Sequence, residues 1–482
     1  MPQGKGSATT PSAYQHRIAF GAWVNDMRNE ALPLEQWPAP QFDEATIEGL
    51  VRVLDVMADS GYQCLDTFGW FATESYPLDI VSAFDDAERN RNIAKVIRAA
   101  EKRGLGLSLP LGLMTWGYDR IIREDPSVRG KDQDGNPHAH AMCGAKEKSW
   151  AYVEKIIDTM FAQHEFAAVH LESADLGYCA CPKCAGKYGG VGYNARLNTR
   201  AADYIKQHHP ETVVYVCPIS WVPFALNADG VQVKVSPDDL PYIIELSKHI
   251  DIFMDQGHHG RSLNWEDVPR LHCAYGTSGG LWVYHGARQD RLSYCLPYPR
   301  RAAGHLRDHH EHGARACLYY QGPMINPAVE VNSAVAGRVM CNPSRKPEEA
   351  LEEVIEVYYR PRRAAARQKL AQVYLSLEEA YFGQWQEARF KEVHKLEMPG
   401  EFCLGGLFGT TPDPTLFLLE PFLDPAGRAA CLAGLKRALA DLAAIRRDFR
   451  DDGRVERLVR SCTVMAHLLA TTMNAKGEPW DR

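Results

Sequence analysis

The sequence contains the stretch Ala168-Val-His-Leu-Glu-Ser-Ala-Asp-Leu-Gly-Tyr-Cys-Ala-Cys-Pro-Lys-Cys184, which joins a short apolar run to an acidic residue and three cysteines. The apolar run covers residues 166–171 and is typical of a buried strand. It ends at Glu172, and Ser173, Asp175 and Gly177 then indicate a loop. Because catalytic side chains of α/β barrels lie at the carboxyl ends of the strands, Glu172 is a candidate for catalysis.

The three cysteines of this stretch have the spacing C-x-C-x-x-C. The N-terminus lacks the apolar segment of a secretory signal, so clustered thiols favour a soft metal over a disulfide. Cys143 precedes the helix that leads into the acidic strand, and in a barrel it could fold back beside residues 177–185. We therefore predict a structural zinc site formed by Cys143, Cys179, Cys181 and Cys184, which would pin the loop after Glu172. Loop thiols without a metal and an iron–sulfur cluster are the alternatives.

The composition is that of a soluble globular protein with more than one structural unit. The chain has 482 residues, which exceeds what one hydrophobic core usually serves, and 45% of them are hydrophobic while 24% are charged. The net charge of −7 gives no reason to expect a nucleic acid or an anionic membrane as a partner. No apolar run approaches the length of a membrane span, and the missing secretory signal predicts a cytoplasmic location.

Strand and helix patterns alternate through the first two thirds of the chain. The expected strands cover residues 17–24, 62–66, 105–114, 166–171, 213–217, 250–254, 281–284 and 316–320. This alternation predicts an α/β fold, a (β/α)8 TIM barrel over residues 16–325 that follows a disordered tail at residues 1–15. Residues 326–482 show helical periodicity alone and predict an all-helical C-terminal domain. A doubly wound open sheet is the alternative, although no G-x-G-x-x-G or Walker motif follows any strand.

In a barrel, the residues that follow the strands share one rim, and here that rim is rich in acids and aromatic residues. Aromatic rings pack on the C–H face of a sugar ring, and carboxylates handle the proton and the oxocarbenium-like charge of glycoside cleavage. The substrate-binding candidates are Asp26, Asp66, Trp70, Trp116, His170, Trp221, His258, Tyr284, His285, Tyr320 and Gln321.

Three acids are the catalytic candidates. Glu172 is the expected general acid, because apolar neighbours raise a carboxyl pKa towards protonation at neutral pH. Asp255 is the leading candidate for the second carboxylate, as base or nucleophile, with Asp66 and Asp26 as rivals. Asp175 would orient Glu172 or share its charge. The structural alternatives are a salt-bridged barrel residue for Glu172 and an Asx-turn for Asp175.

These residues resemble a known group of barrel glycosidases. Asp134, Cys143, a helix, the strand that ends in Glu172 and the run from Cys179 to Cys184 look like the middle of α-glucuronidase and β-N-acetylhexosaminidase-like barrels, and of related uncharacterised bacterial barrel domains. In that group the acid after the fourth strand is the general acid, which the resemblance assigns to Glu172. Some β-galactosidase barrels have a similar cysteine run that holds zinc together with one upstream cysteine.

The resemblance extends into the C-terminal part and also has two departures. Asn326-Pro, Asn332, Arg338 and Asn342-Pro343, followed by helices, are similar to the helical domain of α-glucuronidases. An N-terminal α/β domain of the kind those enzymes usually carry is absent. The Asp-Glu pair of hexosaminidases is absent too, because Leu171 precedes Glu172, which puts a substrate-assisted mechanism in doubt.

These observations predict a glycoside hydrolase that cleaves an oligosaccharide or glycoside by carboxylate acid/base chemistry. The expected partner is a small carbohydrate substrate. Neither a nucleic acid nor a membrane is expected as a partner, and a homo-oligomer is possible. One alternative is a metal-dependent sugar isomerase or lyase, for which Asp255, His258 and His285 could bind a divalent ion. Another is a non-catalytic carbohydrate-binding barrel.

Overall fold

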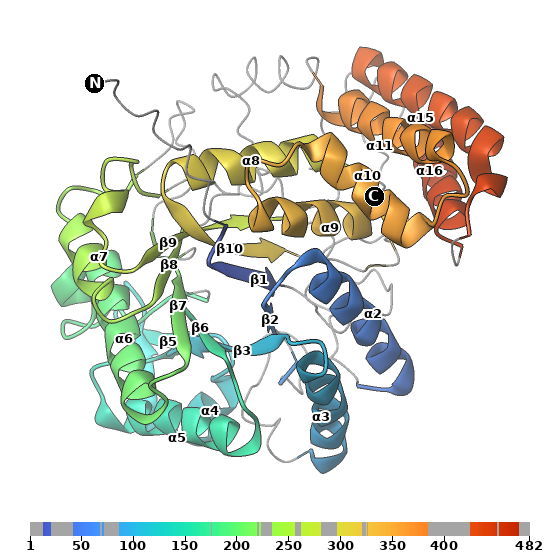
Figure 1. Ribbon diagram of the computed structural model, residues 1–482. Coiled ribbons are helices and arrows are strands. Elements are labelled where there is room, and N and C mark those ends of the chain that lie inside the picture. The colour runs from blue at the N-terminus through green and yellow to red at the C-terminus, as the bar shows by residue number, and fades with distance from the viewer. Residues whose placement is uncertain are drawn as a thin grey trace, which may run out of the picture.

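The structure is a computed structural model that describes residues 13–20, 42–67, 70–71, 86–174, 176–218, 221–222, 234–255, 262–280, 296–320, 324, 326–383, 425–450 and 453–471. Within these residues, eight parallel strands close into a barrel in the order β1-β10-β9-β8-β7-β6-β3-β2 (Figure 1). The strands are β1 (His16–Phe20), β2 (Cys64–Asp66), β3 (Gly106–Leu113), β6 (Ala168–Ser173), β7 (Val213–Cys217), β8 (Ile252–Asp255), β9 (Ala274–Gly279) and β10 (Ala314–Tyr320). Because β1 pairs with both β2 and β10, the sheet has no edge and the open-sheet alternative is excluded.

The seventh strand of the barrel corrects one sequence prediction. It is β9, with the sequence Ala-Tyr-Gly-Thr-Ser-Gly, and not the segment 281–284, which lies outside the described residues. Residues 272–275, which overlap the start of β9, also have an extended pattern in the sequence, but the glycines that follow them usually weaken a strand. At Gly276 the neighbouring strands approach closely, since a Cβ would stand 2.6 Å from Sδ of Met254 and 3.2 Å from Cβ of Ala316.

Helices surround the barrel and connect successive strands. They are α2 (Glu44–Ser60), α3 (Ala87–Glu101), α5 (Glu147–Gln163), α6 (Ala185–His208), α7 (Leu240–Leu246), α8 (Pro299–Glu311) and α9 (Pro327–Cys341). Helix α2 shows how local sequence sets the bounds. It begins where the Asp43 side chain accepts a hydrogen bond from the Thr46 amide, and it ends at Gly61, whose φ of 87° is left-handed. Between β8 and β9 the described residues contain only the short 3-10 helix η5 (Val268–Arg270).

One insertion follows β3 and bears on the candidate site. It contains α4 (Asp119–Glu124), the 3-10 helix η3 (Pro126–Val128) and an antiparallel hairpin of β4 (Arg129–Lys131) and β5 (Pro137–Met142). Cys143 follows β5 directly. The hairpin therefore carries the predicted fourth metal ligand towards the loop after β6.

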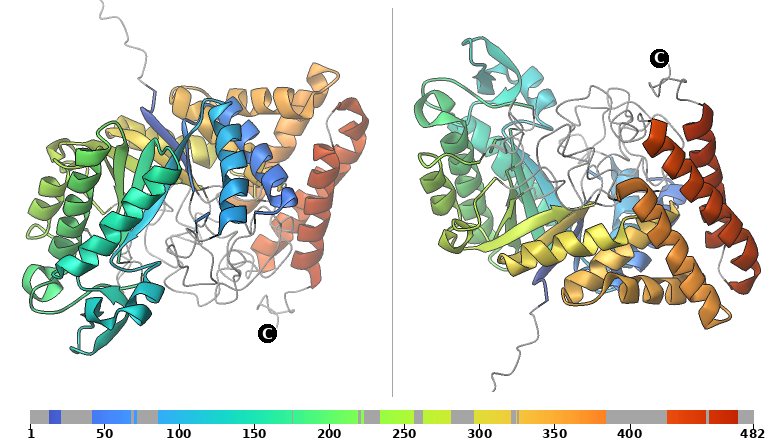
Figure 2. Two further views of the ribbon diagram at one scale, coloured as in Figure 1. Left: turned by 90° about the horizontal axis from the view of Figure 1, so that it is seen from below. Right: turned by 90° about the horizontal axis from the view of Figure 1, so that it is seen from above.

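Helix α9 closes the ring of helices, since it packs against α8 on one side and α2 on the other. Its residues 327–340 are all buried. It is thus the helix of the barrel ring that follows the eighth strand, β10, whereas its sequence pattern groups it with the helices that follow. Those helices are α10 (Pro347–Tyr359), α11 (Ala364–Phe382), α15 (Pro425–Ile445) and α16 (Arg454–Thr471). Figure 2 shows α15 and α16 on the side of the barrel away from α6.

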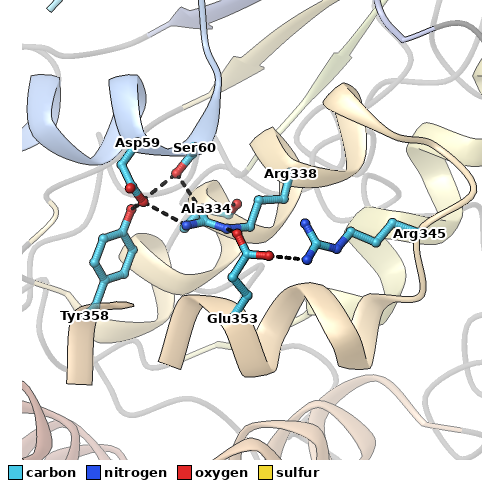
Figure 3. Close-up of polar contacts among 7 residues, drawn as sticks. All are labelled: Asp59, Ser60, Ala334, Arg338, Arg345, Glu353 and Tyr358. Carbon is cyan, nitrogen blue, oxygen red and sulfur yellow. Dashed lines mark hydrogen bonds and ion pairs between the residues drawn. The ribbon is translucent and has the colours of Figure 1, made fainter. Parts of the chain in front are cut away.

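Arg338 fastens the barrel to the C-terminal helices. Its buried guanidinium lies between Asp59 at the end of α2, at 2.7 Å, and Glu353 of α10, at 2.9 Å (Figure 3). It also donates to the hydroxyl of Ser60 and to the carbonyl of Ala334. One side chain of α9 therefore joins the first barrel helix to the helical region.

The chain joins the fold before β1. Residues 1–12 of the expected tail lie outside the described residues, but Tyr14 is fully buried and donates from its hydroxyl to the Leu306 carbonyl at 2.7 Å. None of the helices in the described ranges combines the length and the apolar composition that a bilayer crossing requires.

Candidate functional site at the mouth of the barrel

Side-chain alternation along the strands determines which residues face the barrel interior. In β6, Val169 and Leu171 belong to the core outside the barrel, so His170 and Glu172 face inward. Glu172 is the last inward residue of the strand and is 16% exposed, whereas His170 is 2% exposed. The strand thus delivers a partly accessible carboxylate to the mouth and keeps an imidazole behind it.

Three ionisable side chains form a row from the interior towards the mouth. Asp66, the last residue of β2, is fully buried and its Oδ2 lies 2.9 Å from Nδ1 of His170. On the other side of the ring, Nε2 of His170 lies 3.8 Å from Oε2 of Glu172. The sequence predicted all three residues for the rim but not their order, because the register between β2 and β6 is set through β3.

The charge of His170 follows from its two acidic neighbours. Burial lowers the pKa of His170, but the negative charge and hydrogen bond of Asp66 and the charge of Glu172 outweigh burial and leave that pKa raised. The imidazole therefore favours the cationic form beside Glu172. A cation at this place stabilises a carboxylate that has given up its proton.

Tyr215 and Ser108 complete the buried network and were not predicted. Tyr215 of β7 donates to Oδ2 of Asp66 at 2.5 Å, and its hydroxyl lies 2.9 Å from that of Ser108 on β3. Its ring stacks on His170, with centroids 4.9 Å apart and planes inclined by 17°. Alternation within β7 could have shown that Tyr215 faces inward, but only the pairing of His170 with Tyr215 across β6 and β7 shows that they meet.

The backbone is strained at the two strand ends next to this row. Met114, directly after β3, has φ of 62°, and Ala174, directly after β6, has φ of 71°. Such left-handed conformations of residues other than glycine are uncommon and concentrate at functional sites. Within β3, Gly112 leaves room for Trp116, since a Cβ on Gly112 would lie 2.5 Å from the Trp116 carbonyl oxygen. Trp116 thereby folds back over the barrel interior.

Asp255 does not join this row. Ile252 and Met254 fill the interior, so Asp255 faces the opposite side of β8. Its carboxylate accepts hydrogen bonds from the Ser262 amide and hydroxyl, the Leu263 amide and the hydroxyl of Tyr275. The carboxylate thus fixes the chain after β8, and the structure does not bring it to Glu172 as the sequence prediction required.

The aromatic candidates divide into two groups. Trp116 and Tyr320 belong to the interior cluster, and Tyr320 contacts Phe20 edge to face at 4.7 Å. Trp70 and Trp221 belong instead to the larger core cluster and are buried. The remaining candidates lie outside the described residues: Asp26, Asp175, His258, Tyr284, His285 and Gln321.

The four cysteines come together as predicted. The sulfur atoms of Cys143, Cys179, Cys181 and Cys184 all lie within 4.8 Å of one another, and no other group of three or more His, Cys, Asp or Glu in the described ranges has metal-binding spacing. Sγ of Cys143 is 3.9 Å from that of Cys181 and 3.7 Å from that of Cys184. The backbone amide of Lys131 in the hairpin donates to Sγ of Cys179 at 3.4 Å. The cluster can hold a metal ion.

The thiols share negative charge unevenly. Hydrogen bonds from Cys179 and Cys184 hold the pKa of Cys143 well below its usual range. Hydrogen bonds with Cys143 and Cys179, together with burial, raise the pKa of Cys184. One thiolate is therefore favoured in this cluster, while further thiolates repel it and need a cation for balance.

The fold is that of barrel glycoside hydrolases, although sequence similarity is low. No family model matches the chain, and no curated protein sequence matches it. A GH138 enzyme targeting pectin rhamnogalacturonan II is 11% identical, with a TM-score of 0.54 over 95% of this chain and 71% of that one. The structure of CpGH84B is 9% identical, with a TM-score of 0.50 over 96% and 68% of the two chains. The predicted likeness to glycosidase barrels is confirmed for the fold.

Proposed function

We propose that the protein is a glycoside hydrolase in which Glu172 protonates the leaving oxygen. The observation that carries this proposal is the row of Asp66, His170 and Glu172, which ends in a partly exposed carboxylate inside the barrel mouth. Catalytic groups of such barrels come from this end of the strands. Trp116 and Tyr320, which share the interior cluster, are apolar faces of the kind that pack on a sugar ring.

The chemistry of the row follows from its charges. When Glu172 transfers its proton to the glycosidic oxygen, a carboxylate remains 3.8 Å from the His170 ring. The imidazolium stabilises this new charge, and Asp66 balances the imidazolium from behind. The glycosidic C–O bond breaks, the leaving group departs as an alcohol, and water forms the new bond to the anomeric carbon. The proton of this water goes to the second carboxylate in an inverting reaction, or to Glu172 in a retaining reaction in which the water hydrolyses a glycosyl-enzyme.

The second carboxylate of the reaction is assigned differently from the sequence prediction. Asp255 is left out, because its carboxylate is enclosed on the outer side of β8. Asp66 is left out as well, because it is fully buried behind His170. Asp26 remains as the predicted rival and lies outside the described residues, while Asp175 keeps its predicted role of orienting Glu172 or sharing its charge.

A panel of aryl glycosides that includes uronides and N-acetylhexosaminides tests this function. Wild-type protein should release the aryl group from at least one member, and Glu172→Gln should be slowed most on members whose leaving oxygen most needs a proton. Turnover that chelator abolishes and manganese restores would instead support the isomerase or lyase. Saturable binding of a sugar by wild type and Glu172→Gln alike, without hydrolysis, would support the non-catalytic barrel.

We also propose that the four cysteines bind zinc in a structural site. A tetrahedral zinc with Zn–S bonds of about 2.3 Å places sulfur atoms about 3.8 Å apart. The separations of 3.9 Å and 3.7 Å from Cys143 agree with that geometry and are far too long for a disulfide. The ion would tie the β4–β5 hairpin to the loop that follows Glu172, and it takes no part in the proposed proton transfer.

A further inference from the structure

We propose that Tyr215 is a positioning residue of this site, which holds Asp66 and the plane of His170 so that Nε2 of His170 faces Glu172. The inference rests on the proposed function, because it concerns the same acid. Tyr215 is fully buried and acts through its neighbours rather than on a substrate.

The hydroxyl of Tyr215 is a permanent hydrogen-bond donor to the row. Burial, followed by the charges of Asp66, Cys64 and Cys217, raises the pKa of Tyr215 well above its usual value, so the phenol stays protonated. It donates to Oδ2 of Asp66, the same oxygen that faces Nδ1 of His170. With Ser108 behind the phenol, the carboxylate is kept in one orientation.

The ring of Tyr215 fixes the imidazole from one face. It stacks on His170 at 4.9 Å, and Phe20 presents an edge contact to His170 at 5.8 Å with planes inclined by 69°. The imidazole is thereby confined between the two aromatic rings. Because Nε2 and the Glu172 carboxylate are 3.8 Å apart, a rotation of the imidazole would separate the two groups.

The groups around His170 come from strands β1, β2, β6 and β7. Because each group is a separate side chain, Tyr215 can be substituted while the others stay in place. Asp66 of β2 and Glu172 of β6 provide the charges. Cys64 and Cys217 are buried thiols of the same interior cluster. Tyr215 combines a hydrogen bond to the carboxylate with a stack on the imidazole.

Two substitutions separate the hydroxyl from the ring. Tyr215→Phe keeps the stack and removes the donor, and Tyr215→Leu removes both. We expect kcat to fall about tenfold for Tyr215→Phe and more for Tyr215→Leu, with KM within about twofold, because the effect is on the acid and not on sugar binding. Tyr319→Phe on β10 is the matched control, since Tyr319 is equally buried but belongs to the core outside the barrel.

A second measurement does not depend on activity. In full-length protein labelled with 15N-histidine, and with the His170 signal assigned by its loss in His170→Asn, the Nδ1 proton should be sharp and protected in wild type and in Tyr319→Phe. It should broaden and exchange faster in Tyr215→Phe and more so in Tyr215→Leu. Unchanged His170 signals in both Tyr215 variants would overturn the proposal, as would a changed signal with unchanged kcat. A wild type that hydrolyses no glycoside would instead refute the proposed function, and the His170 signals would then decide the positioning role alone.

Discussion

At the scale of single residues, the reactivity of the site depends on which charges surround His170. The imidazole lies between Asp66 and Glu172 and is almost fully buried. A buried imidazolium is stable only beside a counter-charge, which Asp66 supplies, and the charge of Glu172 adds to it when that acid is ionised. The protonation of the three groups is therefore coupled, and the pH dependence of the reaction reports on the row as a unit.

His170 gives a pH prediction with a definite sign. Its pKa is raised above the usual value of about 6.5, so the imidazolium is fully present below that pH and is lost as the pH rises through the raised pKa. We expect kcat to fall on the alkaline side with this pKa. His170→Asn keeps a donor towards Asp66 but cannot ionise, so any alkaline fall that remains reports the loss of the Glu172 proton and should occur at a different pH. An alkaline inflection at an unchanged pH in His170→Asn would contradict the assignment.

Asp255 gives the opposite prediction, in which stability changes and catalysis does not. Asparagine at this position offers one acceptor oxygen where the carboxylate accepts from Ser262, Leu263 and Tyr275. We expect Asp255→Asn to lower the free energy of unfolding by about 2–3 kcal/mol, measured by urea denaturation, because buried donors lose their acceptor. Its kcat should stay within about threefold of wild type. A loss of catalysis above about a hundredfold in folded protein would restore Asp255 as the second carboxylate.

Residue-level prediction from the sequence succeeded where the strand end alone determines the position. Glu172, His170 and Asp66 follow from the end of an apolar run, and the structure brings them together. It failed for Asp255, because a run of four residues does not show which face is inward. Tyr215 was missed because its partners come from other strands.

At the scale of elements, the β4–β5 hairpin and the loop after β6 depend on the cysteine cluster. Cys143 follows β5, and the other three cysteines precede α6. Short strands and a loop of this kind have little core of their own, so a metal ion would supply most of their order. The sequence could predict this cluster because C-x-C-x-x-C is a local signal, and the barrel topology supplied the fourth thiol.

Removal of the metal should loosen this region and leave the barrel folded. We expect about one zinc per chain by elemental analysis of purified protein, and none in Cys179→Ser/Cys184→Ser. Hydrogen exchange should increase in residues 129–142 and 176–184 of that variant, while β7 and β10 stay protected. A variant with Cys64→Ser, a buried cysteine outside the cluster, is the control. Iron in place of zinc would identify an iron–sulfur cluster instead. Equal hydrogen exchange of residues 129–142 and 176–184 with and without the metal would contradict a structural role.

Element prediction was also limited by composition. Most strands were predicted because they are apolar runs, but β9 contains two glycines and a serine and was misplaced. Its glycine at 276 lies close to Met254 and Ala316 of the two adjacent strands, a closeness that no local pattern shows. Likewise α9 has the composition of the helices after it, and only its packing between α8 and α2 assigns it to the barrel ring.

At the scale of the whole molecule, ion pairs made by two buried side chains of α9 join the barrel to the C-terminal helices. Arg338 links α9 to α2 and α10, and Arg454 of α16 reaches Glu330 of α9 with two nitrogens at 2.9–3.0 Å. Both contacts converge on α9, which is itself the last helix of the barrel ring. The barrel and the helical region should therefore unfold together.

The Arg338 contacts predict a marked loss of stability. Arg338→Met removes a guanidinium that is 5% exposed, which leaves Asp59 with the hydroxyl of Tyr358 and Glu353 with Arg345. We expect the free energy of unfolding to fall by about 2 kcal/mol, a value reduced because both carboxylates are partly exposed. Arg345→Met is the control, since Arg345 also pairs with Glu353 but is 28% exposed, and it should cost less than about 1 kcal/mol. Equal losses in urea denaturation would contradict this account of α9.

The most direct test of the proposed function compares leaving groups in the Glu172→Gln variant. A general acid matters for a glycoside whose leaving oxygen needs a proton and hardly matters for a dinitrophenyl glycoside, which leaves as a stable anion. We predict that Glu172→Gln lowers kcat about 10³-fold for an alkyl glycoside and less than about tenfold for the dinitrophenyl glycoside of the same sugar. Equal loss with both leaving groups, or no loss with either, would show that Glu172 is not the proton donor.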